Sequence, residues 1–148
     1  MLVVPGNHDR TKLASSERFF NIHLRKLELD GLVFVGYGWM GSDLDPERQM
    51  DRFHEVEPWI DHNTVLVTHC PPFGTLDVMK DLNGTRYRIG SGKLAKAIDR
   101  LKPRFHLFGH IHDSVGAKGT SVNGSYPKIK HFFGIDTETK RVWAEIEK

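Results

Sequence analysis

Three short apolar segments of this sequence run directly into side chains that can bind a metal ion. Residues 2–4, 64–68 and 105–108 have the β-branched and aromatic composition of buried strands. Buried strands followed by metal-binding side chains are typical of an open α/β sheet, because such a sheet binds ions and small molecules beyond the carboxyl ends of its strands. Neighbouring strands would bring one amide and three imidazoles to a common point: Asn7, His69, His110 and His112.

The spacing of apolar residues elsewhere predicts further helices and strands. Helical spacing recurs over residues 15–29, from Pro46 to the residue before Pro58, and between Ser91 and Pro103. Further strands are expected at residues 32–35, 120–122, 128–135 and 141–146. Helices and strands alternate first and strands alone follow, which predicts a single domain over residues 1–148 with an α/β (α+β) fold.

The composition excludes several classes of protein. Of the 148 residues, 39% are apolar and 27% are charged, which is too apolar for extensive disorder. The 21 lysines and arginines nearly balance 19 acidic residues, so charge indicates neither a nucleic acid nor a membrane as partner. A single cysteine, Cys70, rules out an intrachain disulfide and suits a reducing compartment. Because no segment has the pattern of a membrane span or a secretory signal, we expect a cytoplasmic protein.

The residue types at the three strand ends indicate the kind of ion and a catalytic acid. Imidazole nitrogens and an amide oxygen suit Mn, Fe, Zn, Co or Ni better than Mg or Ca alone. His8 is placed to donate a proton to a leaving alkoxide, and Asp9 could hold its ring and keep it protonated. Glycines precede Asn7 and His110, where they would let the backbone turn sharply and approach the site closely.

The order of these motifs resembles the calcineurin-like metallophosphoesterase family. Gly-Asn-His-Asp at 6–9, Thr-His at 68–69 and Gly-His-x-His at 109–112 match in order, and the likeness extends from residue 3 to about residue 125. The segments at 67–74 and 90–91 are similar to small prokaryotic members and to relatives that resemble cyclic-nucleotide phosphodiesterases. The resemblance implies a two-sheet αββα sandwich that hydrolyses a phosphomonoester or phosphodiester with two divalent ions.

The resemblance also assigns roles to residues of this chain. Asn7, His69 and His110 would bind one ion. His112 would bind the other ion. His8 would be the leaving-group acid, with Asp9 as its orienting partner.

Two family motifs are missing from this sequence. The family begins with one strand ending in Asp-x-His and another ending in Gly-Asp, which supply two ligands of the first ion and the aspartate that bridges both. Neither occurs here, so we expect an N-terminally truncated domain whose clamp of two ions on the reacting oxygens is broken. The strand at residues 2–4 would then leave an apolar edge for a separate N-terminal half subunit or a second copy to cover. The alternative is a remnant without catalysis that serves as an interaction module.

A glycine-rich segment offers a different chemistry. Gly36, Gly38 and Gly41 match a dinucleotide-binding loop that follows a predicted strand. However, Asp43 and Asp45 separate this loop from the next helix and would repel phosphates. We therefore expect an ordinary loop here, whose two aromatic side chains flank a substrate pocket or fill the core: Tyr37 and Trp39.

Other polar residues are expected to be structural. Arg86 or Arg88 could steer a phosphate-bearing substrate, but a solvated loop is the simpler interpretation, and the substrate-binding residues are otherwise unknown. Asn83 and Asn123 begin formal glycosylation sequences that we interpret as turns. The remaining histidines are expected to be satisfied or solvated: His23, His54, His62, His106 and His131. Cys70 is expected to be a packing thiol.

Overall fold

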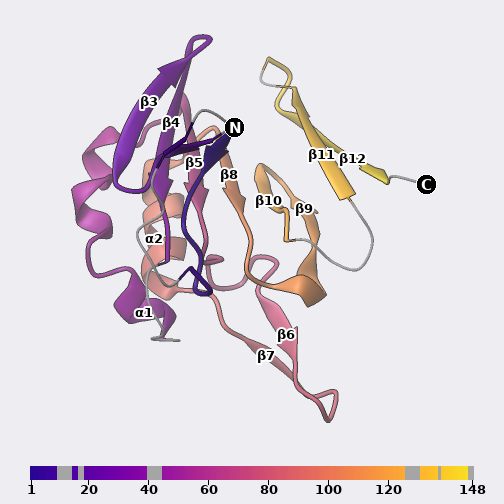
Figure 1. Ribbon diagram of the computed structural model, residues 1–148. Coiled ribbons are helices and arrows are strands. Elements are labelled where there is room, and N and C mark those ends of the chain that lie inside the picture. The colour runs from indigo at the N-terminus through magenta and orange to yellow at the C-terminus, as the bar shows by residue number, and fades with distance from the viewer. Residues whose placement is uncertain (10–14, 17–18, 40–44, 126–130, 137, 147–148) are drawn as a thin grey trace.

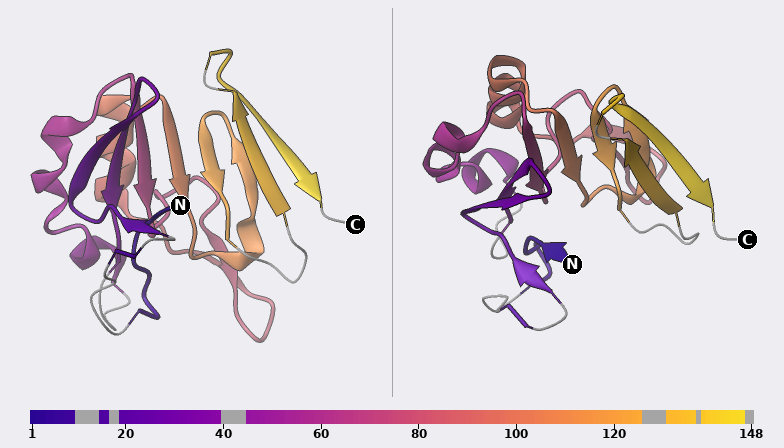
Figure 2. Two further views of the ribbon diagram at one scale, coloured as in Figure 1. Left: turned by 45° about the horizontal axis from the view of Figure 1, so that its top comes forward. Right: turned by 90° about the horizontal axis from the view of Figure 1, so that it is seen from above.

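The computed structural model describes residues 1–9, 15–16, 19–39, 45–125, 131–136 and 138–146. In this part of the chain a six-stranded sheet forms the centre of the molecule, and the helices cover one of its faces (Figures 1 and 2). The N-terminal strand pair lies on the opposite face, and the C-terminal pair extends beyond one edge. The predicted mixed α/β architecture with several sheets is confirmed, although the helices are few.

Four central strands run parallel and therefore end at the same edge of the sheet. They are β4 (Leu32–Tyr37), β5 (Thr64–Thr68), β8 (Phe105–Phe108) and β10 (Ser121–Asn123). At the two sides, β3 (Arg25–Leu29) pairs antiparallel with β4, and β9 (Gly116–Lys118) pairs antiparallel with β10. Val67 of β5 lies opposite Leu107 of β8, so the residues that follow these two strands are neighbours. The strands predicted in these four places are confirmed.

The helical layer packs its apolar side chains on the sheet. It contains α1 (Pro46–Gln49), the 3-10 turns η1 (Phe53–Glu55) and η2 (Glu57–Trp59), and α2 (Gly92–Leu101). Leu94 and Ala97 of α2 are buried with Phe53 and with Val35 and Leu66 of the sheet. The third predicted helix is therefore confirmed, whereas the second breaks after one turn into 3-10 turns. No helix in the described ranges exceeds ten residues, so none of them could cross a bilayer.

The helix predicted over residues 15–29 is wrong where the structure describes it. The segment instead contains β2 (Phe20–Asn21) and β3, and β3 forms a hairpin with β4. Asp30 and Gly31 connect the two strands with φ angles of 51° and 75°. Positive φ at both central residues is the geometry of a tight hairpin turn, and Asp-Gly is among the pairs that favour it. This local turn preference outweighs the helical spacing of the preceding apolar residues.

The first strand lies outside the central sheet, contrary to the prediction that it neighbours the others. β1 (Leu2–Val3) pairs in parallel with β2 in a separate two-stranded sheet. The chain that follows it is docked on the end of β4, because the Trp39 N–H donates to the Pro5 carbonyl at 2.9 Å. A loop contact, rather than strand pairing, thus brings the N-terminal motif to the sheet edge.

Two hairpins project from this core. β6 (Val78–Lys80) and β7 (Arg86–Arg88) form one below the sheet edge, and β11 (His131–Asp136) and β12 (Arg141–Ile146) form the other beside β9 (Figure 1). The predicted strand at 141–146 is confirmed, and residues 128–130 of the strand expected before it lie outside the described residues. The 3-10 turn η3 (His112–Ser114) packs on β6, where Ser114 Oγ donates to the Val78 carbonyl at 2.6 Å.

Candidate metal centre

Three polar side chains from distant parts of the chain meet at the carboxyl edge of the sheet. Asn7 Oδ1 lies 2.8 Å from His69 Nε2 and 3.1 Å from His110 Nδ1. His69 Nε2 and His110 Nδ1 are themselves 3.1 Å apart. The structure therefore brings together three of the four residues that the sequence analysis placed at one point.

Each of the three is delivered by a different local structure. His69 directly follows β5, and the carbonyl of His69 accepts from the Gly109 N–H at 3.4 Å, which joins it to the end of β8. Asn7 lies in the loop after β1, which the contact between Pro5 and Trp39 attaches to β4. The site thus depends on the parallel pairing of β5 and β8 and on one docked loop.

We expected Gly6 and Gly109 to let the backbone approach the site closely, and this holds for Gly6 but not for Gly109. A Cβ atom on Gly6 would lie 2.7 Å from His69 Cε1, closer than real Cβ contacts, so only glycine fits against this ring. A Cβ on Gly109 would meet nothing closer than Ser125 Oγ at 3.6 Å, an ordinary contact. The residue with the unusual backbone is His110 itself, whose φ is 74°. A non-glycine residue in this region stores roughly 1–3 kcal/mol of strain.

Burial keeps the two imidazoles in the form that binds metals. Desolvation, helped by the charge of His110, lowers the pKa of His69 to about 4. Burial also lowers the pKa of His110, and the charges of His8 and His112 act in the same direction. Both rings are therefore neutral near pH 7, and a neutral imidazole nitrogen is the ligand form.

Trp39 is a component of the site whose placement the sequence left undecided. Its indole is 2% exposed and its ring centroid lies 4.7 Å from that of His110 and 5.9 Å from that of His69. Its ring therefore packs against both imidazoles and limits their rotation. Tyr37, the other aromatic of this segment, belongs to the core, where its hydroxyl donates to the Gln49 carbonyl at 2.6 Å. Gly41, the third glycine of the dinucleotide pattern, lies outside the described residues.

The three side-chain atoms lie at hydrogen-bonding distances, and these separations are also those of octahedral ligands around one divalent ion. Ligands at right angles around an ion, each about 2.1 Å from it, are about 3.0 Å apart. The observed separations of 2.8, 3.1 and 3.1 Å fit this value. Two imidazole nitrogens and one amide oxygen also form a donor set suited to a transition metal. Among the described residues no group of three His, Cys, Asp or Glu side chains is placed for a metal, so the amide of Asn7 is essential to this cluster.

The other predicted site residues lie around this cluster. His8 and Asp9 are exposed, and the Asp9 carboxylate accepts from the Gly6 N–H at 2.7 Å, where it stabilises the turn. No hydrogen bond joins Asp9 to the His8 ring, both of which the structure describes. His112 is exposed at the start of η3 and lies outside the three-residue cluster. Its role as a ligand stays a prediction.

The remaining candidates are structural. Cys70 is buried, and burial raises the pKa of its thiol to about 12, which leaves no reactive thiolate. Arg88 forms an ion pair with the fully buried Asp77, at 2.5 Å between Nη1 and Oδ1, so its charge is already engaged. His23 Nδ1 accepts from the Gly38 N–H at 2.8 Å. Gly84 has a φ of 82°, as expected for a turn at Asn83.

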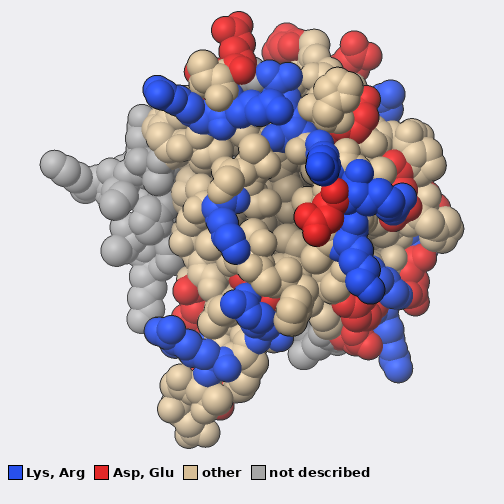
Figure 3. Space-filling view, turned by 180° about the vertical axis from the view of Figure 1, so that it is seen from behind, with Lys and Arg blue, Asp and Glu red and all other residues tan. Residues whose placement is uncertain are grey.

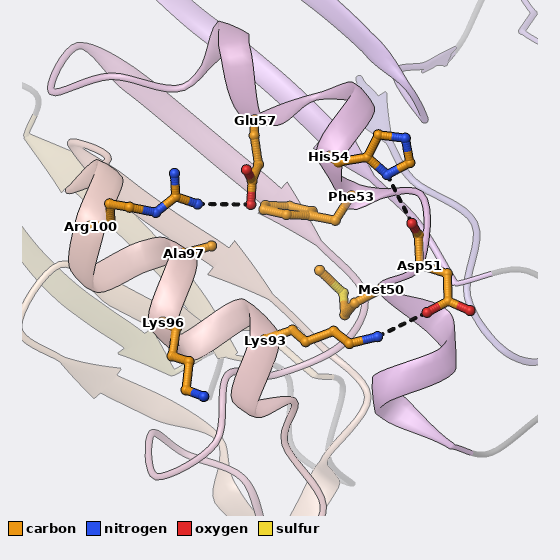
Figure 4. A pocket seen from close by; sticks show the side chains of 9 residues that line it. All are labelled: Met50, Asp51, Phe53, His54, Glu57, Lys93, Lys96, Ala97 and Arg100. Atoms are coloured by element: carbon orange, nitrogen blue, oxygen red, sulfur yellow. Dashed lines mark hydrogen bonds and ion pairs between the residues drawn. The ribbon is translucent and has the colours of Figure 1, made fainter.

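A hollow lies on the helix-covered face, and none of the three clustered side chains lines it. It has a volume of about 360 Å³ and lies between α2 and the segment from α1 to η2 (Figure 4). Ion pairs cross the hollow between Lys93 and Asp51, at 2.9 Å, and between Arg100 and Glu57, at 3.0 Å. Most of the charged side chains that line the hollow are therefore paired. Basic and acidic side chains lie close together over part of this face, beside a broad area without charged residues (Figure 3). The hollow therefore shows no chemistry comparable to that of the three-residue cluster.

Comparison with known proteins identifies the family. A sequence model described as Calcineurin-like phosphoesterase matches residues 1–114. The chain belongs to the calcineurin-like phosphoesterase family. Membership supports a phosphoesterase-like function and a site for divalent metals, and the resemblance drawn from the sequence motifs is confirmed.

Relatives of this family cover most of the chain but are longer. A UPF0046 protein of Caenorhabditis elegans is 31% identical in an alignment 139 positions long, which covers 78% of this chain and 46% of the relative. Metallophosphoesterase domain-containing protein 1 of Homo sapiens is 35% identical in an alignment 116 positions long, which covers 71% of this chain and 33% of the human protein. The chain thus spans less than half the length of these two relatives. A solved crystal structure shares the fold with a TM-score of 0.71 and 16% identity, covering 98% of this chain and 65% of that one.

Proposed function

We propose that this chain binds one divalent metal ion through Asn7, His69 and His110 and acts on a phosphate ester there. The observation that carries the proposal is the convergence of the three ligand atoms within 3.1 Å of one another. Family membership supports the reaction class, phosphoester hydrolysis. Mn, Fe, Zn, Co and Ni are the ions that suit this donor set.

The residues of the chain have separate parts in this proposal. A bound divalent ion would supply positive charge that stabilises the phosphoryl transition state. Asn7, His69 and His110 hold it, while the Trp39 ring keeps the two imidazoles in place. His8 is exposed beside the ligands and donates a proton to the leaving oxygen. His112, at the start of η3, is the ligand proposed for a second ion.

Fluorescence of Trp39 should report metal binding directly. Trp39 is buried, whereas Trp59 and Trp143 are 37% and 48% exposed, so the short-wavelength part of the emission belongs to Trp39. Titration with Co²⁺, which quenches a neighbouring indole, should reduce this part of the emission saturably. His69→Ala should weaken the apparent affinity at least about tenfold, because it removes a ligand. His62→Ala, at an exposed turn, is the matched control. Equal titration curves for the wild type and His69→Ala would refute the site.

Hydrolysis of a generic aryl phosphodiester with Mn²⁺ tests the catalytic half of the proposal. His8→Asn should lower kcat about a hundredfold or more, because general acid catalysis contributes about 10²–10⁴-fold. Co²⁺ affinity of this variant should stay that of the wild type, and His62→Asn should have wild-type kcat. Turnover that does not differ between the wild type and His8→Asn contradicts catalysis by this chain alone.

A metal-binding module without turnover is the second candidate function. It is favoured by the number of ligands: in the parts of the chain that the structure describes, only three side chains meet, and His112 lies outside their cluster. If this is the function, the wild type binds Co²⁺ but hydrolyses the aryl phosphodiester no faster than His8→Asn does. The expected partner, an N-terminal half subunit or a second copy that covers the edge of the strand at residues 2–4, stays a prediction.

A further inference from the structure

We propose that Asn123 is a positioning residue of the metal centre, because its buried carboxamide clamps the strained turn that aims His110 at Asn7 and His69. The inference rests on the metal site proposed above and adds a residue that hydrogen-bonds none of the three ligand side chains. Its position within a formal glycosylation sequence gives no sign of this role.

The turn at His110 needs an external support. The Ile111 N–H donates to the Gly109 carbonyl at 2.9 Å, which closes a three-residue γ-turn with His110 at its centre. The φ of 74° at His110 belongs to the rarer, strained form of this turn. A non-glycine residue remains in such a conformation only where its surroundings hold it there. The support must therefore act on the residues next to His110.

Asn123 supplies that support from the neighbouring strand. Its side chain has no exposed surface, and Nδ2 donates to the Ile111 carbonyl at 2.8 Å and to the Ser114 carbonyl at 3.0 Å. These two carbonyls bracket the segment that carries His112, and Ile111 directly follows His110. Oδ1 accepts from the Ser125 N–H at 3.0 Å, which fixes the orientation of the carboxamide.

A second strained residue is held by the same group. Leu76 has a φ of 50°, and its carbonyl accepts from Asn123 Nδ2 at 3.3 Å. An amide has two N–H donors, so the three carbonyls share them. Asn123 itself is rigidly placed, since β10 pairs with β8 on one side and with β9 on the other. One buried carboxamide thus ties the turns before η3 and before β6 to the central sheet.

Loss of these donors should affect the metal centre more than the fold. Without the bond to the Ile111 carbonyl, the peptide between Ile111 and His112 is no longer held, so the turn before it can relax and move His110 Nδ1 away from Asn7 Oδ1. Side chains that orient ligands typically contribute 10–100-fold to metal affinity. We therefore expect Asn123 variants to bind Co²⁺ at least about tenfold more weakly than the wild type.

Two variants and one control test the proposal. Asn123→Asp has nearly the same shape but no N–H donors, and Asn123→Ser keeps one donor if the aspartate variant does not fold. Thr64→Val is the matched control, because Thr64 is fully buried at the opposite end of β5, where its hydroxyl bonds the Asp61 carboxylate at 3.0 Å. Co²⁺ affinity is measured by calorimetry, and amide hydrogen exchange of Ile111 is measured without metal.

We expect the Asn123 variants to bind Co²⁺ more weakly and to exchange the Ile111 amide hydrogen faster than the wild type. Thr64→Val should show neither change. Wild-type affinity and wild-type Ile111 exchange in a folded Asn123 variant would overturn it, as would an equal loss of affinity in Thr64→Val. If the wild type itself binds no Co²⁺, the metal site proposed above fails, while Ile111 exchange still decides whether Asn123 holds the turn.

Discussion

Gly6→Ala should weaken Co²⁺ binding about 10–100-fold and leave the sheet folded, a loss of the size produced when a ligand is displaced but not removed. The new Cβ would lie 2.7 Å from His69 Cε1 and 2.9 Å from His69 Nδ1. The His69 ring has little room to yield, because it also packs against the rings of Trp39 and His110. Either the ring or the loop that carries Asn7 must therefore move, and the triangle of ligand atoms opens.

Gly109→Ala is the control for this prediction, since it places a methyl group beside the other histidine ligand. Its Cβ meets only Ser125 Oγ, at 3.6 Å, and Gly109 does not have a positive φ. We expect wild-type Co²⁺ affinity in the Trp39 fluorescence titration for this variant. Equal affinities of Gly6→Ala and Gly109→Ala would contradict the close packing of His69 on Gly6.

The meeting of His69 and His110 was predictable because it follows from strand order. Val67 and Leu107 lie opposite each other in parallel strands, so side chains just beyond these strands share an edge. The composition of residues 64–68 and 105–108 is enough to identify both as buried strands. The residues that follow each strand then indicate which side chains could bind a metal ion at this edge.

The N-terminal part was harder to predict, for two physical reasons. Leu27 fits both the helical spacing of the apolar residues before it and the alternation with Leu29, and the turn at Asp30 and Gly31 decides for the hairpin. β1 is only two residues long, so its place depends on contacts of the loop after it, such as Trp39 with Pro5. Such contacts join residues far apart in sequence and leave no periodic signal.

Two supports of the site could not be predicted from sequence. The close approach at Gly6 was expected, but the left-handed conformation lies on His110 itself and not on Gly109. Asn123 lies 13 residues after His110 and reads as a turn residue. Its function depends on the pairing of β10 with β8, which a motif search does not include.

Acid should destabilise this protein through His106, the largest effect on stability that we expect from one side chain. His106 has 1% of its surface exposed, and burial lowers its pKa to about 3. Thr68 Oγ1 donates to the Cys70 carbonyl at 2.7 Å, so His106 Nε2, 2.8 Å away, donates to Thr68, and no partner is found for Nδ1 among the described residues. The ring is therefore held neutral in the fold.

The sign follows from the two pKa values. The folded pKa lies below the unfolded value of 6.5, so the unfolded chain binds a proton first, and stability present above pH 6.5 is lost as the pH falls toward 3. The loss is roughly 1.4 kcal/mol per pH unit below 6.5, or about 2 kcal/mol between pH 7 and pH 5. This is a large fraction of the 5–15 kcal/mol typical of a domain.

His106→Gln separates this effect from other titrating groups, because an amide N–H keeps a donor for Thr68 but does not bind a proton in this range. Urea unfolding in the presence of EDTA should show that the free energy of unfolding falls about 2 kcal/mol less between pH 7 and pH 5 in His106→Gln than in the wild type. Thr68→Val keeps the buried imidazole, so it should lose about 1 kcal/mol at both pH values without changing the slope. Parallel pH profiles for the wild type and His106→Gln would mean that the imidazole is not held neutral, and that its burial does not set the acid stability of the strand that leads to His110.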